Sequence, residues 1–327
     1  MAYIEVRDLC KEFKIAKRET GVKGAFKSFF HREYNIKKAV DNISFSVERG
    51  ELVGYIGPNG AGKSTTIKMM SGILTPTSGT VTVGGIVPYE NRKQNNMRMG
   101  AVFGQRSQLY WDLPIVETFD LYKKMYRIED AVFKHNVDFY IELLDMKEFL
   151  NTPVRQLSLG QKMRGNIATA LLHDPEIVYL DEPTIGLDVL AKSRIRTFIR
   201  EVNKEKKTTL VLTTHDMDDI EQICDRLIMI DKGKKIYDGS LSDFKKTYTR
   251  GSVLCAEFAT EAPIILDDPR LTVKKDEGFR KWILFNKSEI TPVEVLALLQ
   301  KKYDIQDFSL TDTDIEEIVK GLYVDSK

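Results

Sequence analysis

Runs of apolar residues alternate with helix-like patterns through the middle of the chain. Four runs, at residues 52–56, 176–180, 209–214 and 227–230, are almost continuously apolar, and the segments between them space their apolar residues three and four positions apart. A continuous apolar run is typical of a strand buried on both faces, whereas the wider spacing is typical of a helix. The alternation predicts an α/β domain with a mixed, largely parallel sheet.

The N-terminal part carries a different pattern. Residues 3–9 and 41–47 alternate apolar and polar side chains, which predicts two strands with one buried face. Residues 14–38 lie between them as a strongly basic insert that also holds aromatic side chains such as Phe29 and Tyr34. Such a segment suits contact with the anionic inner leaflet of a membrane or with a membrane protein, and a solvated loop is the alternative.

The pattern changes again near Gly251. Short alternating runs and amphipathic segments predict a small α+β domain over residues 251–327, after a main domain over residues 1–250. The strands of the small domain are expected at residues 252–259, 271–276 and 280–286, and its helices at residues 292–303 and 316–323.

The composition is that of a folded protein without strong electrostatic bias. The 327 residues are 42% hydrophobic, and 49 lysines and arginines oppose 48 acidic residues, for a net charge of +1. This balance gives no indication of nucleic-acid binding. Cys10, Cys224 and Cys255 are odd in number and far apart, which disfavours a disulfide framework or a zinc site. We expect them to be buried thiols.

A glycine-rich loop follows the apolar run at residues 52–56. The stretch GPNGAGKST, residues 57–65, matches the pattern G-x-x-x-x-G-K-[ST] and leads into the helical segment 65–70. Its glycines let backbone N–H groups turn toward phosphates, Lys63 reaches the β- and γ-phosphates, and the Ser64 hydroxyl is a ligand for Mg²⁺. The residues expected to bind the nucleotide here are Gly57, Asn59, Gly60, Ala61, Gly62, Lys63, Ser64 and Thr65.

Two carboxylates end the apolar run at residues 176–180. Asp181 and Glu182 follow a predicted strand at its carboxyl end, the edge at which such sheets bind ligands. In a nucleotide site Asp181 would hold Mg²⁺, and Glu182 would polarise the water that attacks the γ-phosphate. A helix cap or a solvated loop is the alternative for such a pair taken alone, but the loop at residues 57–65 favours the nucleotide interpretation.

The stretch LSLGQKMR, residues 157–164, begins a helical pattern that stops at His173, so that Ser158 lies at a helix N-terminus. Free N–H groups and the positive end of the helix dipole favour an anion there. A plain serine N-cap is the alternative. If the anion is a phosphate, these residues alone leave open which chain holds it.

With GPNGAGKST, LSLGQ and LDEPTIGLD in this order, residues 1–240 resemble the ATP-binding subunit of ABC transporters. The resemblance implies the fold of a P-loop NTPase cassette, with a helical subdomain at about residues 106–172. LSLGQ is similar to the signature motif of that family, usually LSGGQ, with Leu159 in place of the first glycine. Leucine is less permissive for the backbone than glycine, so the effect of Leu159 on the catalytic rate stays open.

The resemblance also assigns roles outside these stretches. Gln105 is similar to the glutamine that senses Mg²⁺ and the attacking water, and His215 is similar to the switch histidine that contacts the γ-phosphate. A solvated glutamine and a histidine cap are the alternatives. Phe13 is similar in position to the aromatic residue that stacks on adenine, with a core phenylalanine as the alternative and Tyr34 as a second candidate for the role. Asp188 resembles the residue that couples two sites across a dimer.

In this family two ATPase subunits pack head to tail. The resemblance therefore implies that Ser158, Gly160 and Gln161 act on ATP held by a partner, either a second copy or a related subunit. It implies ATP and Mg²⁺ as the bound groups. The expected catalytic residues are Lys63, Gln105, Glu182 and His215, and the expected metal ligands are Ser64, Gln105 and Asp181.

No apolar run reaches the roughly 18 residues that a spanning helix needs, and the first residues lack the core of a signal peptide. We therefore expect a cytoplasmic subunit, peripheral on the inner face of the membrane, that powers a separate integral membrane permease. The stretches named above and VFGQRSQLYWDLP are most similar to efflux subunits of the viologen and daunorubicin type, which implies export of a small molecule, drug or peptide. An importer subunit and a soluble ABC protein acting on ribosomes or DNA are the alternatives.

A permease contact is implied along the segment after Gln105. Tyr110, Trp111, Leu113 and Pro114 offer aromatic and apolar side chains that suit a loop of a permease. Core packing is the alternative for these residues.

Overall fold

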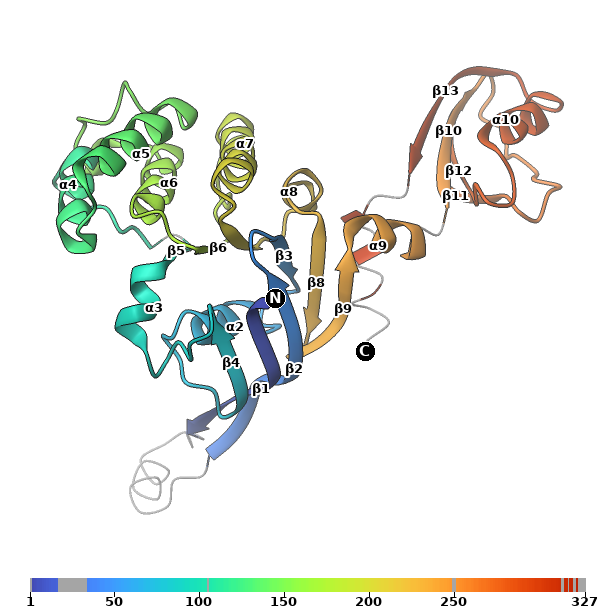
Figure 1. Ribbon diagram of the computed structural model, residues 1–327. Helices are drawn as coiled ribbons and strands as arrows, with labels where there is room; N and C mark the ends of the chain where they lie inside the picture. Colours follow the sequence, from blue (N-terminus) through green and yellow to red (C-terminus); the bar gives the residue numbers. More distant parts are fainter. Residues whose placement is uncertain are drawn as a thin grey trace, which may run out of the picture. The chain divides into compact units, whose positions relative to one another are not determined.

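The apolar runs of the middle of the chain form strands of one six-stranded sheet (Figure 1). The computed structural model describes residues 2–16, 34–104, 106–248 and 251–312, together with residues 315, 316, 318, 319 and 322. In spatial order the strands are β5 (Met99–Phe103), β6 (Ile177–Asp181), β7 (Thr209–Thr213), β3 (Leu52–Ile56), β8 (Arg226–Asp231) and β9 (Lys234–Ser240). Only the pairing of β8 with β9 is antiparallel. The prediction of a mixed, largely parallel sheet is confirmed, although β5 and β9 were not predicted.

A second, antiparallel sheet has the order β2-β1-β4. Its strands are β1 (Ala2–Ala16), β2 (Tyr34–Glu48) and β4 (Ser78–Val83). The strands predicted at residues 3–9 and 41–47 are therefore too short, because β1 and β2 remain paired as far as Ala16 and Tyr34. Both ends of the basic insert, residues 14–16 and 34–38, belong to this ribbon, and residues 17–33 lie outside the described part of the chain.

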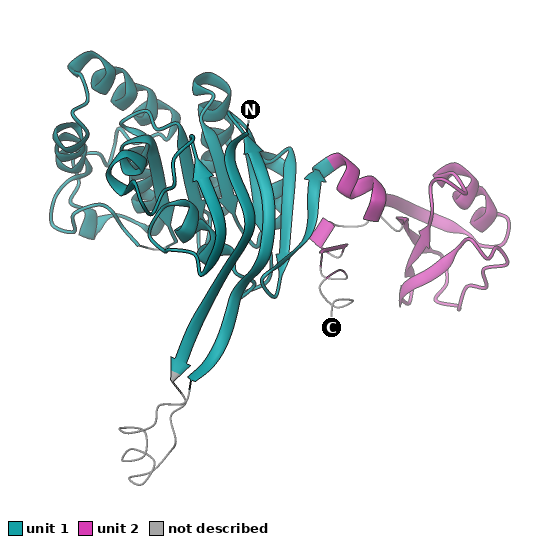
Figure 2. Cartoon of the chain, turned by 60° about the horizontal axis from the view of Figure 1, so that its bottom comes forward, with its two compact units in different colours: residues 1–241 teal, residues 242–327 magenta. Residues whose placement is uncertain are grey.

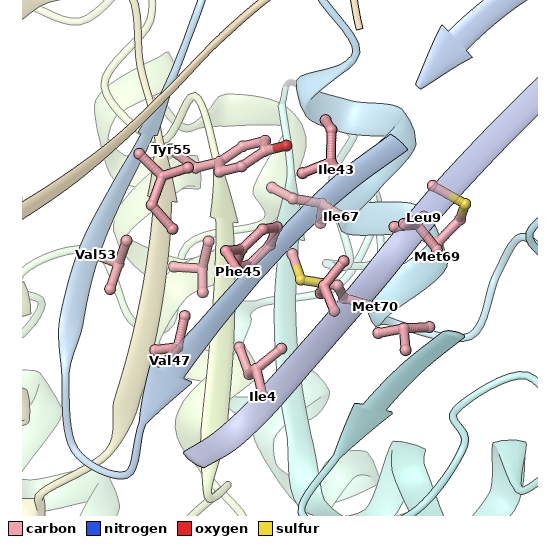
Figure 3. Close-up of a cluster of buried hydrophobic side chains, with 14 of the residues drawn as sticks. Ile4, Leu9, Ile43, Phe45, Val47, Val53, Tyr55, Ile67, Met69 and Met70 are labelled. Carbon is pink, nitrogen blue, oxygen red and sulfur yellow. The ribbon is translucent and has the colours of Figure 1, made fainter. Parts of the chain in front are cut away.

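The main apolar core fills the space between the antiparallel sheet, the central sheet and helix α2 (Lys63–Met70), as Figure 3 shows. Its labelled members are Ile4, Leu9, Ile43, Phe45, Val47, Val53, Tyr55, Ile67, Met69 and Met70. Each fully buried isoleucine or leucine contributes about 1.5–3 kcal/mol, so this core fixes α2 against both sheets. Cys224 is buried as predicted, whereas Cys10 and Cys255 are only half-buried, and the prediction is wrong for these two.

Helices α4 (Ile115–Tyr126), α5 (Asp130–Leu143) and α6 (Leu159–Leu171) gather beside β5 and β6, and α7 (Val189–Lys206) follows them in the chain (Figure 1). The buried ring of Tyr140 on α5 makes an edge contact with Phe198 on α7, with ring centroids 5.7 Å apart, and so joins this group to the rest of the unit. The first unit also holds α3 (Arg92–Arg98) and α8 (Met217–Ile223).

The chain divides into two compact units, residues 1–241 and 242–327 (Figure 2). Helix α9 (Leu241–Tyr248) falls almost entirely in the second unit, so the division lies earlier than the predicted boundary at residue 250. The second unit holds a four-stranded antiparallel sheet whose inner face packs against helix α10 (Pro292–Gln300). In spatial order its strands are β11 (Thr272–Glu277), β12 (Arg280–Phe285), β10 (Ser252–Phe258) and β13 (Ile305–Asp312).

Local signals account for α10. Thr291 and Glu294 form a capping box, Pro292 takes the first turn, and Val295 and Leu299 bury one face. Half of the other predicted helix of this unit, at residues 316–323, lies outside the described residues, and its described residues 316, 318, 319 and 322 are helical. Strand β13 was not predicted, because its polar residues give it a weak alternating pattern.

Candidate active site

The glycine-rich loop connects the fully buried strand β3 to α2. A side chain at Gly57 would collide with the carbonyl of Ile230, and one at Gly62 with the carbonyl of Ala39. Gly62 also has a φ of 111°, in the region that favours glycine, and it is the N-cap of α2 without any side-chain cap. The first N–H groups of α2 are therefore available to a phosphate.

Lys63 spans the loop. The side chain is nearly buried, at 6% exposure, and its Nζ donates to the carbonyls of Gly57 at 2.7 Å and Pro58 at 3.3 Å. Burial lowers the pKa of Lys63, and the negative charges of Glu182 and Asp181 oppose that change. A cation held in this way, with neutral hydrogen-bond partners, is poised to attract phosphate oxygens.

Asp181 sits at the carboxyl end of β6, beside Thr213 at the end of β7. Its Oδ1 accepts a hydrogen bond from the Thr213 hydroxyl at 2.5 Å and one from the Ser64 hydroxyl at 3.3 Å. Thr213 was not predicted as a site residue, although two threonines end the apolar run at residues 209–214. Parallel pairing of the two strands is what brings Thr213 to the carboxylate.

Glu182 has an unusual backbone for a non-glycine residue. Its φ is 54°, and its N–H donates to the Thr213 carbonyl at 2.9 Å. Its carboxylate Oε1 lies 3.6 Å from Nδ1 of His215, whose side chain is largely exposed. A left-handed backbone is one device by which an active site orients a side chain, and Glu182 lies on the wall of the cavity described below.

A buried aspartate joins the loops that carry Glu182 and His215. Asp219 on α8 is fully buried and accepts hydrogen bonds from Thr184, which follows β6, and from Thr214 at 2.9 Å, which follows β7. Arg196 of α7 donates its Nε to the other oxygen of Asp219 at 2.6 Å and balances its charge. The network restrains both loops that carry predicted catalytic residues.

The oxygen atoms present fit Mg²⁺. The described part of the chain has no cluster of three or more histidine, cysteine, aspartate or glutamate side chains that could hold a metal by themselves. Mg²⁺ instead favours one or two protein oxygens together with substrate phosphates and water. The Ser64 hydroxyl and the Asp181 carboxylate, which already share a hydrogen bond, supply such a pair.

The glycine-rich loop, Asp181 and Glu182 line one cavity of about 570 Å³, whereas the predicted residues Gly57, Ala61 and His215 are not on its wall. Phe13 lines it, whereas Tyr34 is absent from its wall. Gly104 was not predicted, and neither were three residues of the β1–β2 ribbon, Ile15, Lys37 and Ala39. Gln105 lies outside the described residues. The predicted residues on the wall are Phe13, Asn59, Gly60, Gly62, Lys63, Ser64, Thr65, Asp181 and Glu182.

Ser158 lies apart from this cavity, at the start of α6. It forms a capping box with Gln161: the serine Oγ accepts the Gln161 N–H at 3.2 Å, and the glutamine Oε1 accepts the Ser158 N–H at 2.8 Å. Leu159 is 42% exposed and its Cδ2 lies near Gly186, while a Cβ at Gly160 would come within 3.2 Å of the Ala191 Cβ.

Asp188, the N-cap of α7, also lies off the cavity wall. Its carboxylate accepts the Ala191 N–H at 2.8 Å. The next two side chains, Val189 and Leu190, are 81% and 75% exposed. The structure of one chain therefore does not bring Asp188 or the residues of the LSLGQ stretch to the phosphate loop.

The chain matches the ABC transporter family and relatives named as ATP-binding proteins. The family described as ABC transporter matches residues 40–185. The chain is 34% identical over 212 residues to the ABC transporter ATP-binding protein NatA of Bacillus subtilis (strain 168), covering 65% of this chain and 86% of NatA. It is 37% identical over 212 residues to the linearmycin resistance ATP-binding protein LnrL of the same organism, covering 65% of this chain and 68% of LnrL.

Solved structures with the same fold include two cassettes. The dimeric post-hydrolysis state of the ATP-binding cassette MJ0796, bound to ADP and Pi, aligns with a TM-score of 0.60 at 25% identity, over 73% of this chain and 98% of MJ0796. CbiO1 from Clostridium perfringens, part of the ABC transporter complex CbiONQ, aligns with a TM-score of 0.61 at 26% identity, over 75% of this chain and 91% of CbiO1.

Proposed function

We propose that this chain, which belongs to the family of ABC transporter ATP-binding proteins, powers export through a separate membrane permease. The proposed cargo is a small molecule, drug or peptide. The chain is an ABC-type ATPase subunit of a transporter. The observation that carries the proposal is the convergence of Lys63, Asp181 and Glu182 on one cavity. Export is favoured over import because the relative LnrL is named for linearmycin resistance.

In the proposed mechanism, the N–H groups of the loop and the Lys63 ammonium hold the β- and γ-phosphates. Ser64 and Asp181 are the residues that would hold Mg²⁺, which would offset phosphate charge when bound. Glu182 accepts a hydrogen bond from the attacking water and aligns it with the γ-phosphate. His215 is proposed as the histidine that contacts the γ-phosphate, because its Nδ1 lies 3.6 Å from Oε1 of Glu182.

A second ATPase subunit is proposed to complete each site. In one chain Ser158 and Asp188 do not line the cavity that Lys63 lines. Leu159, which follows Ser158, and Val189 and Leu190, which follow Asp188, expose apolar side chains, which suits a subunit interface. The family relative MJ0796 is described as dimeric with ADP and Pi bound. Head-to-tail packing would therefore place the Ser158 hydroxyl over a nucleotide held by the partner.

The proposed permease contact lies at the start of the helical group. Tyr110, Trp111 and Leu113 are 48%, 61% and 44% exposed, which argues against the core-packing alternative for these three. Lys162 Nζ lies 4.7 Å from the centroid of the Trp111 ring, and this cation–π contact restrains a side chain that is still mostly exposed. A rigid, exposed aromatic residue is typical of the anchor of a protein interface.

None of the helices among the residues described is both long and apolar enough to cross a bilayer. We propose that the basic insert meets the anionic leaflet instead, because Tyr34 and Ile36 are exposed on the same ribbon as Lys14. A variant in which Asn-Gly joins Ala16 to Tyr34 keeps the paired strands and removes residues 17–33. It should keep ATP hydrolysis and sediment less with anionic vesicles, and equal sedimentation of both proteins would contradict this contact.

Glu182→Gln tests the proposed hydrolysis. The substitution keeps the size of the side chain but removes the base, so turnover should fall by at least about 100-fold while ATP still binds. Glu176→Gln is the matched control, because Glu176 precedes the opposite end of the same strand and contacts Arg49 instead of the cavity. Steady-state phosphate release and fluorescent-nucleotide binding would be measured for both. Near-normal turnover of Glu182→Gln would remove Glu182 from the catalytic role.

A further inference from the structure

The nucleotide cavity continues onto the β1–β2 ribbon beyond Phe13. Ile15 of β1 and Lys37 of β2 line the same cavity as Lys63 and Glu182. The two strands run out together from the first unit as a long hairpin (Figure 2). No sequence motif marks Ile15 or Lys37, and neither belongs to the glycine-rich loop.

Strand register explains why these residues face the cavity. Phe13 pairs with Lys37, and Ile15 pairs with Asn35. Side chains two residues apart on a strand share a face, and directly paired residues share it as well. Phe13, Ile15 and Lys37 therefore form one continuous surface, with the apolar residues on one strand and the cation beside them on the other.

Lys38, the next residue of β2, faces the opposite side of the ribbon and, unlike Lys37, has ion-pair partners. Its Nζ lies 3.9 Å from Oε1 of Glu12, its cross-strand partner, and 3.5 Å from Oδ1 of Asp41. Within the described ranges, Lys37 has neither an ion pair nor a hydrogen bond. Lys38 is therefore paired with carboxylates of its own chain. Lys37 presents its charge to the nucleotide cavity without such a partner.

We propose that Ile15 and Lys37 are nucleotide-binding residues, Ile15 as an extension of the apolar surface under the base and Lys37 as a cation that attracts the phosphates. Ile15 is half exposed, and Phe13 alone offers a small platform, so a base lying on both removes more apolar surface from water. The positive charge of Lys37 attracts the negative phosphates by Coulomb interaction, without direct contact. The inference rests on ATP binding in this cavity, and it makes the hairpin part of the binding site.

Lys37→Gln tests the charge, with Lys38→Gln as the matched control one residue away on the other face. Displacement of a fluorescent ATP analogue from the full chain would measure affinities for ATP, ADP and adenosine at low and high salt. Lys37→Gln should weaken ATP binding about three-fold, ADP binding less and adenosine binding not at all, with the effect shrinking in high salt. Lys38→Gln should leave all three affinities unchanged.

Ile15→Ser tests the apolar surface, with Ile36→Ser as the control on the opposite face. Ile15→Ser should weaken ATP and adenosine binding by the same factor of about three, because the base is common to both. Equal losses in Lys37→Gln and Lys38→Gln, or in the two isoleucine variants, would overturn the inference. Failure of the unmutated chain to bind ATP would instead refute the proposed function.

Discussion

Helices α2 and α6 both begin in stretches that the sequence marks as anion-binding candidates, yet their first turns differ. The N-cap of α2 is Gly62, which has no side chain to cap the helix, whereas the N-cap of α6 is Ser158, which forms a capping box with Gln161. Lys63 at the start of α2 is nearly buried in the nucleotide cavity, and Ser158 at the start of α6 is exposed and outside it.

The difference indicates how each helix start is used. The uncapped start of α2 leaves its N–H groups to a ligand held by the same chain. At the start of α6, the N–H of Gln161 already donates to the Ser158 hydroxyl oxygen. The O–H of Ser158 can still donate a hydrogen bond to a further acceptor. In the proposed head-to-tail dimer, a phosphate held by the partner would be that acceptor.

The largest predicted effect comes from dividing the two helix starts between chains. One mixed dimer combines a Lys63→Ala chain with a Ser158→Arg chain, and a second pairs an unmutated chain with one that carries both changes. If Ser158 serves the partner's ATP, the first dimer has one intact site and the second has none. The first should hydrolyse ATP at least about ten-fold faster.

The two dimers contain the same substitutions, so most effects on stability cancel. Separate affinity tags on the two chains allow each dimer to be purified before phosphate release is measured. A faster second dimer would mean that Ser158 acts on the nucleotide of its own chain, and the contrast between α2 and α6 would then be lost.

A smaller effect concerns the other end of α6. His173 is stacked on Tyr126, with ring centroids 3.9 Å apart, and its Nε2 lies 3.1 Å from the Met99 carbonyl of β5. Burial lowers the pKa of His173 from 6.5 to about 4. The folded state thus keeps the ring neutral while the unfolded chain binds a proton below pH 6.5, so stability falls as pH decreases through this window.

Between pH 7.5 and pH 5 this residue should account for a loss of about 2 kcal/mol of unfolding free energy. His173→Gln removes the titration and should flatten that part of the pH profile, measured by urea unfolding. His135→Gln, which replaces an exposed histidine of α5, is the control for the substitution itself. An unaltered profile in His173→Gln would show that the ring does not titrate differently in the folded state.

The smallest effect tests the caps themselves. Ser158→Ala removes the side-chain cap of α6 and should lower the free energy of unfolding by about 1 kcal/mol without nucleotide. Ser64→Ala lies in the first turn of α2, where no side chain caps the helix, and should cost less than half as much. Chemical denaturation of the nucleotide-free chain compares them, and equal losses would contradict the difference in capping.

The sequence determined the features that depend on neighbouring residues. The sequence predicted the glycine-rich loop, the pair Asp181 and Glu182 at a strand end, and Ser158 at a helix start. Turns, strand ends and caps can be predicted because a few adjacent residues set them. The apolar runs also fixed the largely parallel sheet, since strands buried on both faces leave a continuous apolar pattern.

Only the tertiary structure decided which distant residues meet. Thr213 reaches Asp181 through the pairing of β6 with β7, and Lys37 reaches the nucleotide cavity through the register of β2 against β1. A shift of one residue in that register would have turned Lys38 to the cavity instead. The sequence alone does not distinguish Lys37 from Lys38. Which of them faces the cavity depends on the pairing of β2 with β1.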